Sequence, residues 1–167
     1  MSLRSELFDP ERHDVREFSC GEPSLDAWLR EQAAPSAARR TARTWVWVYE
    51  DGCVVGYYAL AAHKVARDDV PSNIGRGGPV EIPAVLLARL ALSDSLRGQG
   101  LGAVLVADAL QRVVDATQTV AARLVVVDAL HERVARFYET LGFRRVPASL
   151  LLVQKVANIE SALRSSD

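Results

Sequence analysis

Residues that bind metal ions or form disulfides are scarce in this sequence, which has only two cysteines and three histidines among 167 residues. No histidine lies at ligand spacing from Cys20 or Cys53, so no metal site is expected. The longest strongly apolar stretch, Leu124 to Val127, is far shorter than the roughly 20 residues that cross a bilayer. No apolar run follows a basic start at the N-terminus, as a secretory signal would require. We therefore expect a soluble, cytoplasmic protein without metal or membrane contact.

Lysine and net positive charge are scarce as well. Only Lys64 and Lys155 are lysines, so arginine carries nearly all the positive charge, and its planar guanidinium suits phosphate recognition. The 20 basic and 21 acidic residues give a formal net charge of -1. The chain therefore lacks the overall positive charge of many nucleic-acid binders, and any basic surface has to be local.

Composition argues against disorder and against several domains. The chain is 49% hydrophobic, with 10 glycines and 7 prolines, so it is neither of low complexity nor poor in apolar residues. Its length suits one hydrophobic core. We predict a single domain over residues 1–167.

The first half of the chain reads as a helix, a hairpin and a loop. Pro23 can open a helix whose apolar residues recur at helical spacing until Pro35 stops the pattern. Aromatic and branched residues on both sides of Asp51-Gly52 predict two strands, from Thr44 to Tyr49 and from Cys53 to Leu60. Between Lys64 and Glu81, many glycines, prolines and aspartates predict a surface loop.

The second half alternates strands and helices. Ile82 to Leu92 predicts a strand, and the helix that begins at Leu101 has apolar rows facing a sheet, with Asp108 on its opposite, polar face. The remaining predicted elements are a strand at Leu124 to Asp128, a helix at Glu132 to Leu141 capped by Gly142, and closing strands at Phe143 to Val146 and Leu150 to Lys155.

The most informative motif is the segment RGQGLG, from Arg97 to Gly102. Gly98, Gly100 and Gly102 allow backbone conformations that point several amide groups in one direction. Because the segment opens a helix, these amides meet the positive end of the helix dipole and would suit a phosphate or pyrophosphate. A nucleotide P-loop needs Lys and then Ser or Thr after the last glycine. The sequence has Ala103 and Val104 there.

The segment has a spaced pattern: an arginine, two residues, a glycine, one residue and a further glycine, at Arg97, Gly100 and Gly102. This pattern resembles the pyrophosphate loop of the GNAT acetyltransferases. The pair Phe137 and Tyr138 before Leu141-Gly142-Phe143 is similar to a second motif of that family. Four further blocks resemble the GNAT toxins of bacterial toxin-antitoxin systems: FSCGEPSLDAWL at 18–29, GYYAL at 56–60, LARLAL at 87–92 and VVDAL at 126–130.

The resemblance implies an α/β (α+β) fold with a mixed central sheet flanked by helices, and acetyl-CoA as cosubstrate. It implies that Tyr138 is the catalytic acid, and that the acceptor is the α-amine of an aminoacyl-tRNA, whose acetylation stops translation. A cognate antitoxin and a homodimer are expected on the same ground. The implied acetyl-CoA contacts are the backbone of Leu90, Ala91 and Leu92 and the loop residues Arg97, Gly98, Gln99, Gly100, Leu101 and Gly102.

Arginines provide the candidate tRNA contacts. The densest basic run is Arg30, Arg39, Arg40 and Arg43, and a looser second cluster comprises Arg133, Arg136, Arg144 and Arg145. For a single cluster, solvated surface charge is the better explanation, whereas two clusters in a chain of net charge -1 are compatible with a basic field on one side. Arg89 is a lone charge in a predicted buried strand, so it should pair with an acid, with Asp128 as a candidate, or reach the active cleft.

Two other functions remain open from the sequence. An acetyltransferase of the same fold could act on a small amine, an antibiotic or a protein N-terminus, and a small cationic acceptor would favour an acidic cleft. A non-catalytic binding module could keep the fold and use its arginine faces. An intact RGQGLG motif and Tyr138 argue against the second of these.

Overall fold

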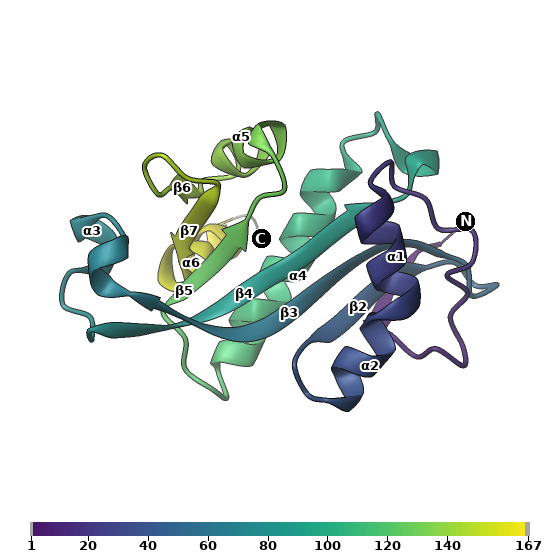
Figure 1. The fold of residues 1–167 in the computed structure, drawn as a ribbon, viewed down its shortest axis with the longest axis horizontal. Helices are drawn as coiled ribbons and strands as arrows, with labels where there is room; N and C mark the ends of the chain where they lie inside the picture. Colours follow the sequence, from purple (N-terminus) through teal and green to yellow (C-terminus); the bar gives the residue numbers. More distant parts are fainter. Residues whose placement is uncertain (1, 166–167) are drawn as a thin grey trace. The chain divides into compact units, whose positions relative to one another are not determined.

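A computed structural model describes residues 2–165 as a seven-stranded sheet with helices (Figure 1). The strand order is β1-β2-β3-β4-β5-β7-β6. Strands β4 and β5 are parallel, whereas β1-β2, β2-β3, β5-β7 and β6-β7 are antiparallel. The predicted mixed sheet with flanking helices is therefore confirmed. The strands are β1 Arg4–Leu7, β2 Arg43–Val48, β3 Val54–Ala66, β4 Glu81–Leu92, β5 Leu124–Asp128, β6 Arg144–Arg145 and β7 Leu151–Lys155.

The helices are α1 Pro23–Glu31, α2 Ala33–Ala38, α3 Ser72–Gly75, α4 Leu101–Thr117, α5 Glu132–Thr140 and α6 Val156–Ser165, with short 3-10 helices at Arg67–Asp69 and Asp94–Leu96. Within residues 2–165, no helix is long and apolar enough to span a membrane. The described chain forms two compact units. Unit 1 contains residues 2–61 and 88–109, and unit 2 contains residues 62–87 and 110–165.

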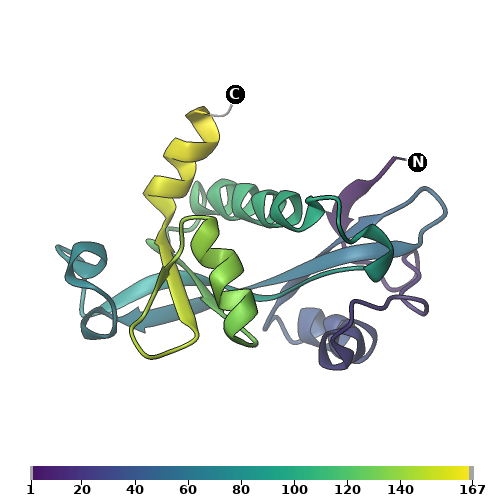
Figure 2. The ribbon, with the colours of Figure 1, turned by 90° about the horizontal axis from the view of Figure 1, so that it is seen from above.

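Unit 1 has helices on both faces of its strands (Figure 2). Successive side chains of a strand point to opposite faces, and Val46 and Tyr57 pack in a buried cluster with Leu29 of α1. On the other face, Trp47 and Tyr58 both donate hydrogen bonds to Asp108 of α4. The prediction that Asp108 lies on the outer face of its helix is therefore wrong.

Pro35 does not end the first helical segment. The break comes at Gln32, which ends α1 and precedes α2, and Pro35 is the third residue of α2. Proline is tolerated there because the amides of a first helical turn have no partner within the helix. The hairpin around Asp51-Gly52 is confirmed, and its second strand continues to Ala66.

Unit 2 overturns the prediction of a surface loop between Lys64 and Glu81. Strand β3 enters this segment and α3 lies within it. Val65, Val70 and Ile74 are buried in a cluster with residues of β4, β5 and β7. The apolar residues are few, but Val65, Val70 and Ile74 point inward, which a count of glycines and prolines does not reveal. At the other end of the unit, Gly142 follows α5 with φ +94°, so the predicted glycine cap is confirmed.

Candidate functional site

The RGQGLG segment lies in unit 1 and leads into α4. Gly98 and Gly100 have φ values of +77° and +73°, and an added Cβ at either position would meet no atom within 4 Å. Glycine is therefore needed for backbone conformation and not for space. Gly102 lies inside the first turn of α4 without a positive φ, so only Gly98 and Gly100 of the three use the left-handed conformation that glycine allows.

The amides of this segment are available to a ligand. Within residues 2–165, the backbone N–H groups of Gly98, Gln99 and Gly100 donate no hydrogen bond. These residues are exposed, and α4 continues for 17 residues behind them. The free amides and the helix dipole together favour an anion at this end of α4.

The Arg97 side chain, which was expected to contact acetyl-CoA, is engaged within the protein. Its guanidinium lies 2.9 Å from Asp94 Oδ1 and also donates to the carbonyl oxygen of Cys20. Gly21, with φ +87°, allows this contact, because a Cβ there would lie 2.9 Å from Arg97 Nη2. Arg97 thus ties the loop to the segment before α1, and its charge is already matched by Asp94.

The end of β4 carries the residues predicted to contact acetyl-CoA. In unit 2, β4 pairs with β5 from Ala84 to Leu87, and Leu90, Ala91 and Leu92 lie further along the same strand, in unit 1. The Ala91 side chain is buried, and those of Leu90 and Leu92 are half-buried.

Tyr138 lies on α5 in unit 2 and is only 4% exposed. Its ring packs edge-on against Phe137 and Phe143, each with a centroid separation of 5.4 Å. Two other buried tyrosines use their hydroxyls inside the protein, since Tyr57 donates to the Leu25 carbonyl and Tyr58 donates to Asp108. The Tyr138 hydroxyl has no such partner in the described chain.

Burial raises the pKa of Tyr138. Its phenol is therefore protonated at neutral pH and can give a proton to a ligand. All the other predicted site residues belong to unit 1, so the structure groups the donor-loop residues with one another and places Tyr138 in the other unit.

Ion pairs hold α5 against β6. Arg145 donates to Glu132 Oε2 at 2.8 Å and to Glu139 Oε1 at 2.7 Å. The hydrogen bond from Arg145 lowers the pKa of Glu132, and the two carboxylates raise the pKa of Arg145. Arg145 is therefore engaged within the protein, which corrects its assignment to a free basic cluster.

The densest arginine run keeps its charge available. Arg30, Arg39, Arg40 and Arg43 are all exposed, and none forms a salt bridge within residues 2–165. Arg30 also donates to the Phe18 carbonyl oxygen at 2.9 Å. This run surrounds α2 and leaves unit 1 with a local basic surface.

Asp128, the candidate partner of Arg89, belongs to unit 2, where it is exposed at the end of β5. Arg89 belongs to unit 1 and forms no salt bridge in the described chain. Its guanidinium carbon lies 5.0 Å from the centroid of the Trp28 ring, and Trp28 stacks on Tyr57 with an interplanar angle of 6°. The Arg89 charge is therefore stabilised by partial exposure to solvent and by the aromatic face of Trp28, and not by a carboxylate.

Residues 6–143 match the model of the Acetyltransferase (GNAT) family. The chain belongs to this family. It is 40% identical over 147 residues to a tRNA-acetylating toxin of Mycobacterium tuberculosis, covering 86% of this chain and 88% of that protein. This GNAT chain also resembles the structure of AtaT complexed with acetyl-methionyl-tRNAfMet, with a TM-score of 0.88, 30% identity, and coverage of 97% of this chain and 99% of that one.

A third relative is a tyrosine-to-phenylalanine mutant of the AtaT toxin, bound to the C-terminus of the antitoxin AtaR and to acetyl-CoA. Its TM-score is 0.82 at 29% identity, covering 96% of this chain and 98% of that one. This GNAT chain is thus similar over nearly its whole length to proteins solved with an acetyl donor, an acetylated aminoacyl-tRNA and an antitoxin.

Proposed function

We propose that this protein transfers the acetyl group of acetyl-CoA to the α-amine of an aminoacyl-tRNA, and that it thereby blocks translation as the toxin of a toxin-antitoxin pair. The observation that carries the proposal is the 40% identity to a tRNA-acetylating toxin over 86% of the chain. The AtaT structures support it, because one was solved with acetyl-methionyl-tRNAfMet and another with acetyl-CoA.

The donor is held mainly by backbone groups in this proposal. The exposed amides of Gly98, Gln99 and Gly100 and the start of α4, at Leu101 and Gly102, bind the pyrophosphate. Arg97 holds the loop in place through Asp94. The backbone of residues 90–92 hydrogen-bonds the pantetheine arm.

The reaction forms a C–N bond between the acceptor amine and the acetyl carbon, and it breaks the C–S bond of the thioester. A free α-amine has a pKa of about 7.7–8.0, and esterification of the neighbouring carboxylate lowers it, so no strong general base is needed. Tyr138 gives its phenolic proton to the departing sulfur, and the proton lost by the attacking nitrogen restores the phenol.

The acceptor and partners follow from the same proposal. Charged tRNA is present in the cytoplasm, so we place the protein there. Arg30, Arg39, Arg40, Arg43 and Arg89 stay predicted tRNA contacts, and binding through them would weaken strongly with salt. A homodimer stays a prediction from family resemblance, which light scattering on the purified chain would test.

Mass spectrometry of charged tRNA after incubation with the protein and isotope-labelled acetyl-CoA tests the proposal directly. We expect the label on the α-amine of the esterified amino acid, and much less of it with the variant Tyr138→Phe. Consumption of acetyl-CoA by small amines but not by charged tRNA would favour the alternative acceptor, and no consumption at all would favour a binding module.

A further inference from the structure

Helix α5, which carries Tyr138, has few fully buried side chains to hold it in unit 2. It is nine residues long, and only Ala135 and Tyr138 are buried. A helix this short is marginal in water without tertiary contacts, and one of its two buried side chains is the predicted acid. Polar contacts therefore have to contribute to the fixed position of this helix.

The Tyr138 hydroxyl is not held by a hydrogen bond of its own. Tyr57 and Tyr58 donate to the Leu25 carbonyl oxygen and to Asp108, whereas the Tyr138 hydroxyl has no partner in the described chain. Its direction therefore depends on how α5 is seated. A misplacement of about 1 Å can lower a reaction rate about 10²-fold, so a small rotation of α5 would be sufficient to disable this phenol.

Arg145 provides the polar contact that fixes α5. Its guanidinium donates to Glu132, the first residue of the helix, at 2.8 Å and to Glu139, the last but one, at 2.7 Å. The two glutamates are almost two turns apart and lie on the same side of the helix. Two attachment points on one side oppose both tilting and rotation of the helix. The fork of donors on an arginine has a fixed geometry that the ammonium group of a lysine lacks.

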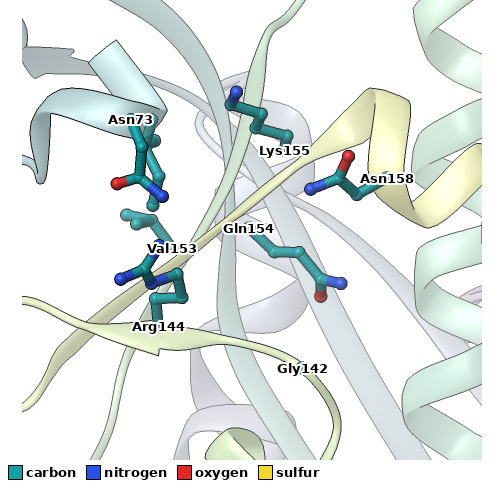
Figure 3. A pocket seen from close by; sticks show the side chains of 8 residues that line it. Asn73, Gly142, Arg144, Val153, Gln154, Lys155 and Asn158 are labelled. Atoms are coloured by element: carbon teal, nitrogen blue, oxygen red, sulfur yellow. The ribbon is translucent and has the colours of Figure 1, made fainter. Parts of the chain in front are cut away.

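The sheet of unit 2 anchors the other side of this contact. Arg145 lies on β6 and pairs with Leu152 of β7, which is fully buried and pairs in turn with Val127 of β5. The turn between α5 and β6 is closely packed as well. Gln154 extends toward Gly142 (Figure 3), and a Cβ at Gly142 would lie 3.1 Å from Gln154 Nε2. Arg145 thus joins α5 to a well-fixed part of the unit.

The place of Glu139 in the helix does not favour stability. The last turn of a helix carries a partial negative charge that disfavours acidic side chains. Helix α5 nevertheless has Glu139 in its last turn and no basic residue there. Glu139 directly follows Tyr138 in the sequence. A bond from Arg145 beside the predicted acid accounts for a glutamate at this position.

We propose that Arg145 is a positioning residue, which sets the rotation of α5 through the two glutamates and thereby directs the Tyr138 hydroxyl to its ligand. The inference rests on the proposed function, in which Tyr138 gives a proton to the leaving sulfur. Arg145 touches neither substrate in this proposal. Its loss therefore lowers the rate of transfer and leaves substrate binding unchanged.

A double-mutant cycle with charged tRNA and acetyl-CoA tests the proposal. Arg145→Gln should lower kcat about tenfold and leave the KM for both substrates unchanged, because the phenol is displaced. In the Tyr138→Phe background there is no phenolic proton to place, so the same substitution should lower kcat less than about twofold. An equal loss in both backgrounds, or a loss that appears only in KM, would overturn the proposal.

Two variants that each remove one bond of Arg145 separate positioning from stability. Glu132→Gln removes an acid from the first turn, where the helix dipole favours it, and Glu139→Gln removes one from the last turn, where the dipole disfavours it. Glu132→Gln should therefore lower the urea midpoint more. Glu139→Gln should lower kcat more, because Glu139 is the neighbour of Tyr138. The same ranking in both measurements would show that the clamp acts only on stability, and would overturn the proposal.

The matched controls alter unit 2 away from α5. Lys64→Gln removes an ion pair between two other elements, from β3 to Glu81 of β4, at 3.1 Å. Ile82→Val weakens a buried cluster whose members all lie outside α5. Both variants should keep the wild-type kcat, although Ile82→Val should unfold at lower urea. A loss of kcat in either control as large as that of Arg145→Gln would contradict a role in positioning.

Fluorine NMR of the protein labelled with 3-fluorotyrosine tests the clamp without an acetylation assay. The chain has four tyrosines, and the signal that is missing from Tyr138→Phe belongs to Tyr138. Arg145→Gln should shift or broaden this signal and leave the other three in place. An unchanged Tyr138 signal would overturn the clamp even if charged tRNA is acetylated. A changed signal in a protein that acetylates no tRNA would support the clamp and contradict only the proposed function.

Discussion

The two units of this chain present their functional groups in different ways. In unit 1, the donor loop offers backbone amides held in place by left-handed glycines and by the Arg97-Asp94 pair. In unit 2, the candidate group is a side chain, the unpartnered phenol of Tyr138. Backbone groups tolerate most side-chain substitutions, whereas side-chain groups are lost by single changes. Mutations should therefore affect the two units unequally.

The largest effect is expected for Tyr138→Phe. The ring stays in its aromatic packing with Phe137 and Phe143, but the proton for the leaving thiolate is lost. Loss of a general acid costs about 10²- to 10⁴-fold, so kcat should fall by about that factor while the KM for acetyl-CoA stays similar. Steady-state kinetics with charged tRNA measures both.

The matched control for that variant is Tyr49→Phe, which removes the hydroxyl of a half-buried tyrosine in unit 1. It should leave kcat unchanged. A Tyr138→Phe enzyme with wild-type kcat would show that the side-chain chemistry assigned to unit 2 is wrong.

The next largest effect concerns the carboxylate that joins α4 to the strands of unit 1. Asp108 Oδ2 accepts hydrogen bonds from Ser5 at 2.6 Å, from Tyr58 at 3.0 Å and from Trp47 at 3.4 Å. Tyr58→Phe removes one donor to a charged acceptor, which should cost about 1.5–3 kcal/mol of unfolding free energy. Urea denaturation measures this loss.

The comparison variant for Asp108 is Tyr57→Phe, whose hydroxyl bonds a neutral carbonyl. It should cost about 0.5–1.5 kcal/mol. Equal losses in the two variants would indicate that the Asp108 network adds nothing beyond an ordinary hydrogen bond.

The third effect tests the donor loop. Gly100→Ala places a side chain at φ +73°, where no atom lies within 4 Å, so only backbone conformation opposes it. The cost of about 1–2 kcal/mol for a left-handed residue should reshape the loop and raise the KM for acetyl-CoA about tenfold with little change in kcat.

Gly77→Ala is a closely matched control for the loop, because Gly77 has the same φ of +73° and the same open surroundings in unit 2. It should carry the same conformational strain but leave the KM for acetyl-CoA unchanged. A similar rise in KM for both variants would mean that strain, and not the loss of an anion-binding loop, is responsible.

The sequence predicted these two regions unequally as well. RGQGLG, the Gly142 cap and the hairpin at Asp51-Gly52 depend on local backbone chemistry, so short patterns were sufficient to find them. The inward position of Asp108 and the stacking of Arg89 on Trp28 depend instead on residues that are distant in the sequence and become neighbours only in the fold. Helical periodicity assigned Asp108 to solvent because it carries a charge, and only the facing Trp47 and Tyr58 reverse that assignment.

Helix α3 gave no signal in the sequence, because the glycines and prolines around Asn73 are typical of a surface loop. Tyr138 could be found only because the motif around it resembles a known family. The burial of its ring against Phe143 and the lack of a partner for its hydroxyl follow only from the three-dimensional structure.

The smallest effect concerns the acid sensitivity of unit 2, where ion pairs fix α5 against β6. The hydrogen bond from Arg145 lowers the pKa of Glu132 from its usual value of 4.5. A lowered folded-state pKa stabilises the protein above about pH 4.5, and this contribution is lost as the pH falls through the folded value. Glu132→Gln should therefore lower the urea midpoint at neutral pH. Plots of the urea midpoint against pH for this variant and for the wild type should converge in acid. The control is Glu31→Gln, on the exposed end of α1, whose plot of urea midpoint against pH should stay parallel to that of the wild type. A parallel plot for Glu132→Gln as well would show that the Arg145 ion pair does not cause the acid sensitivity.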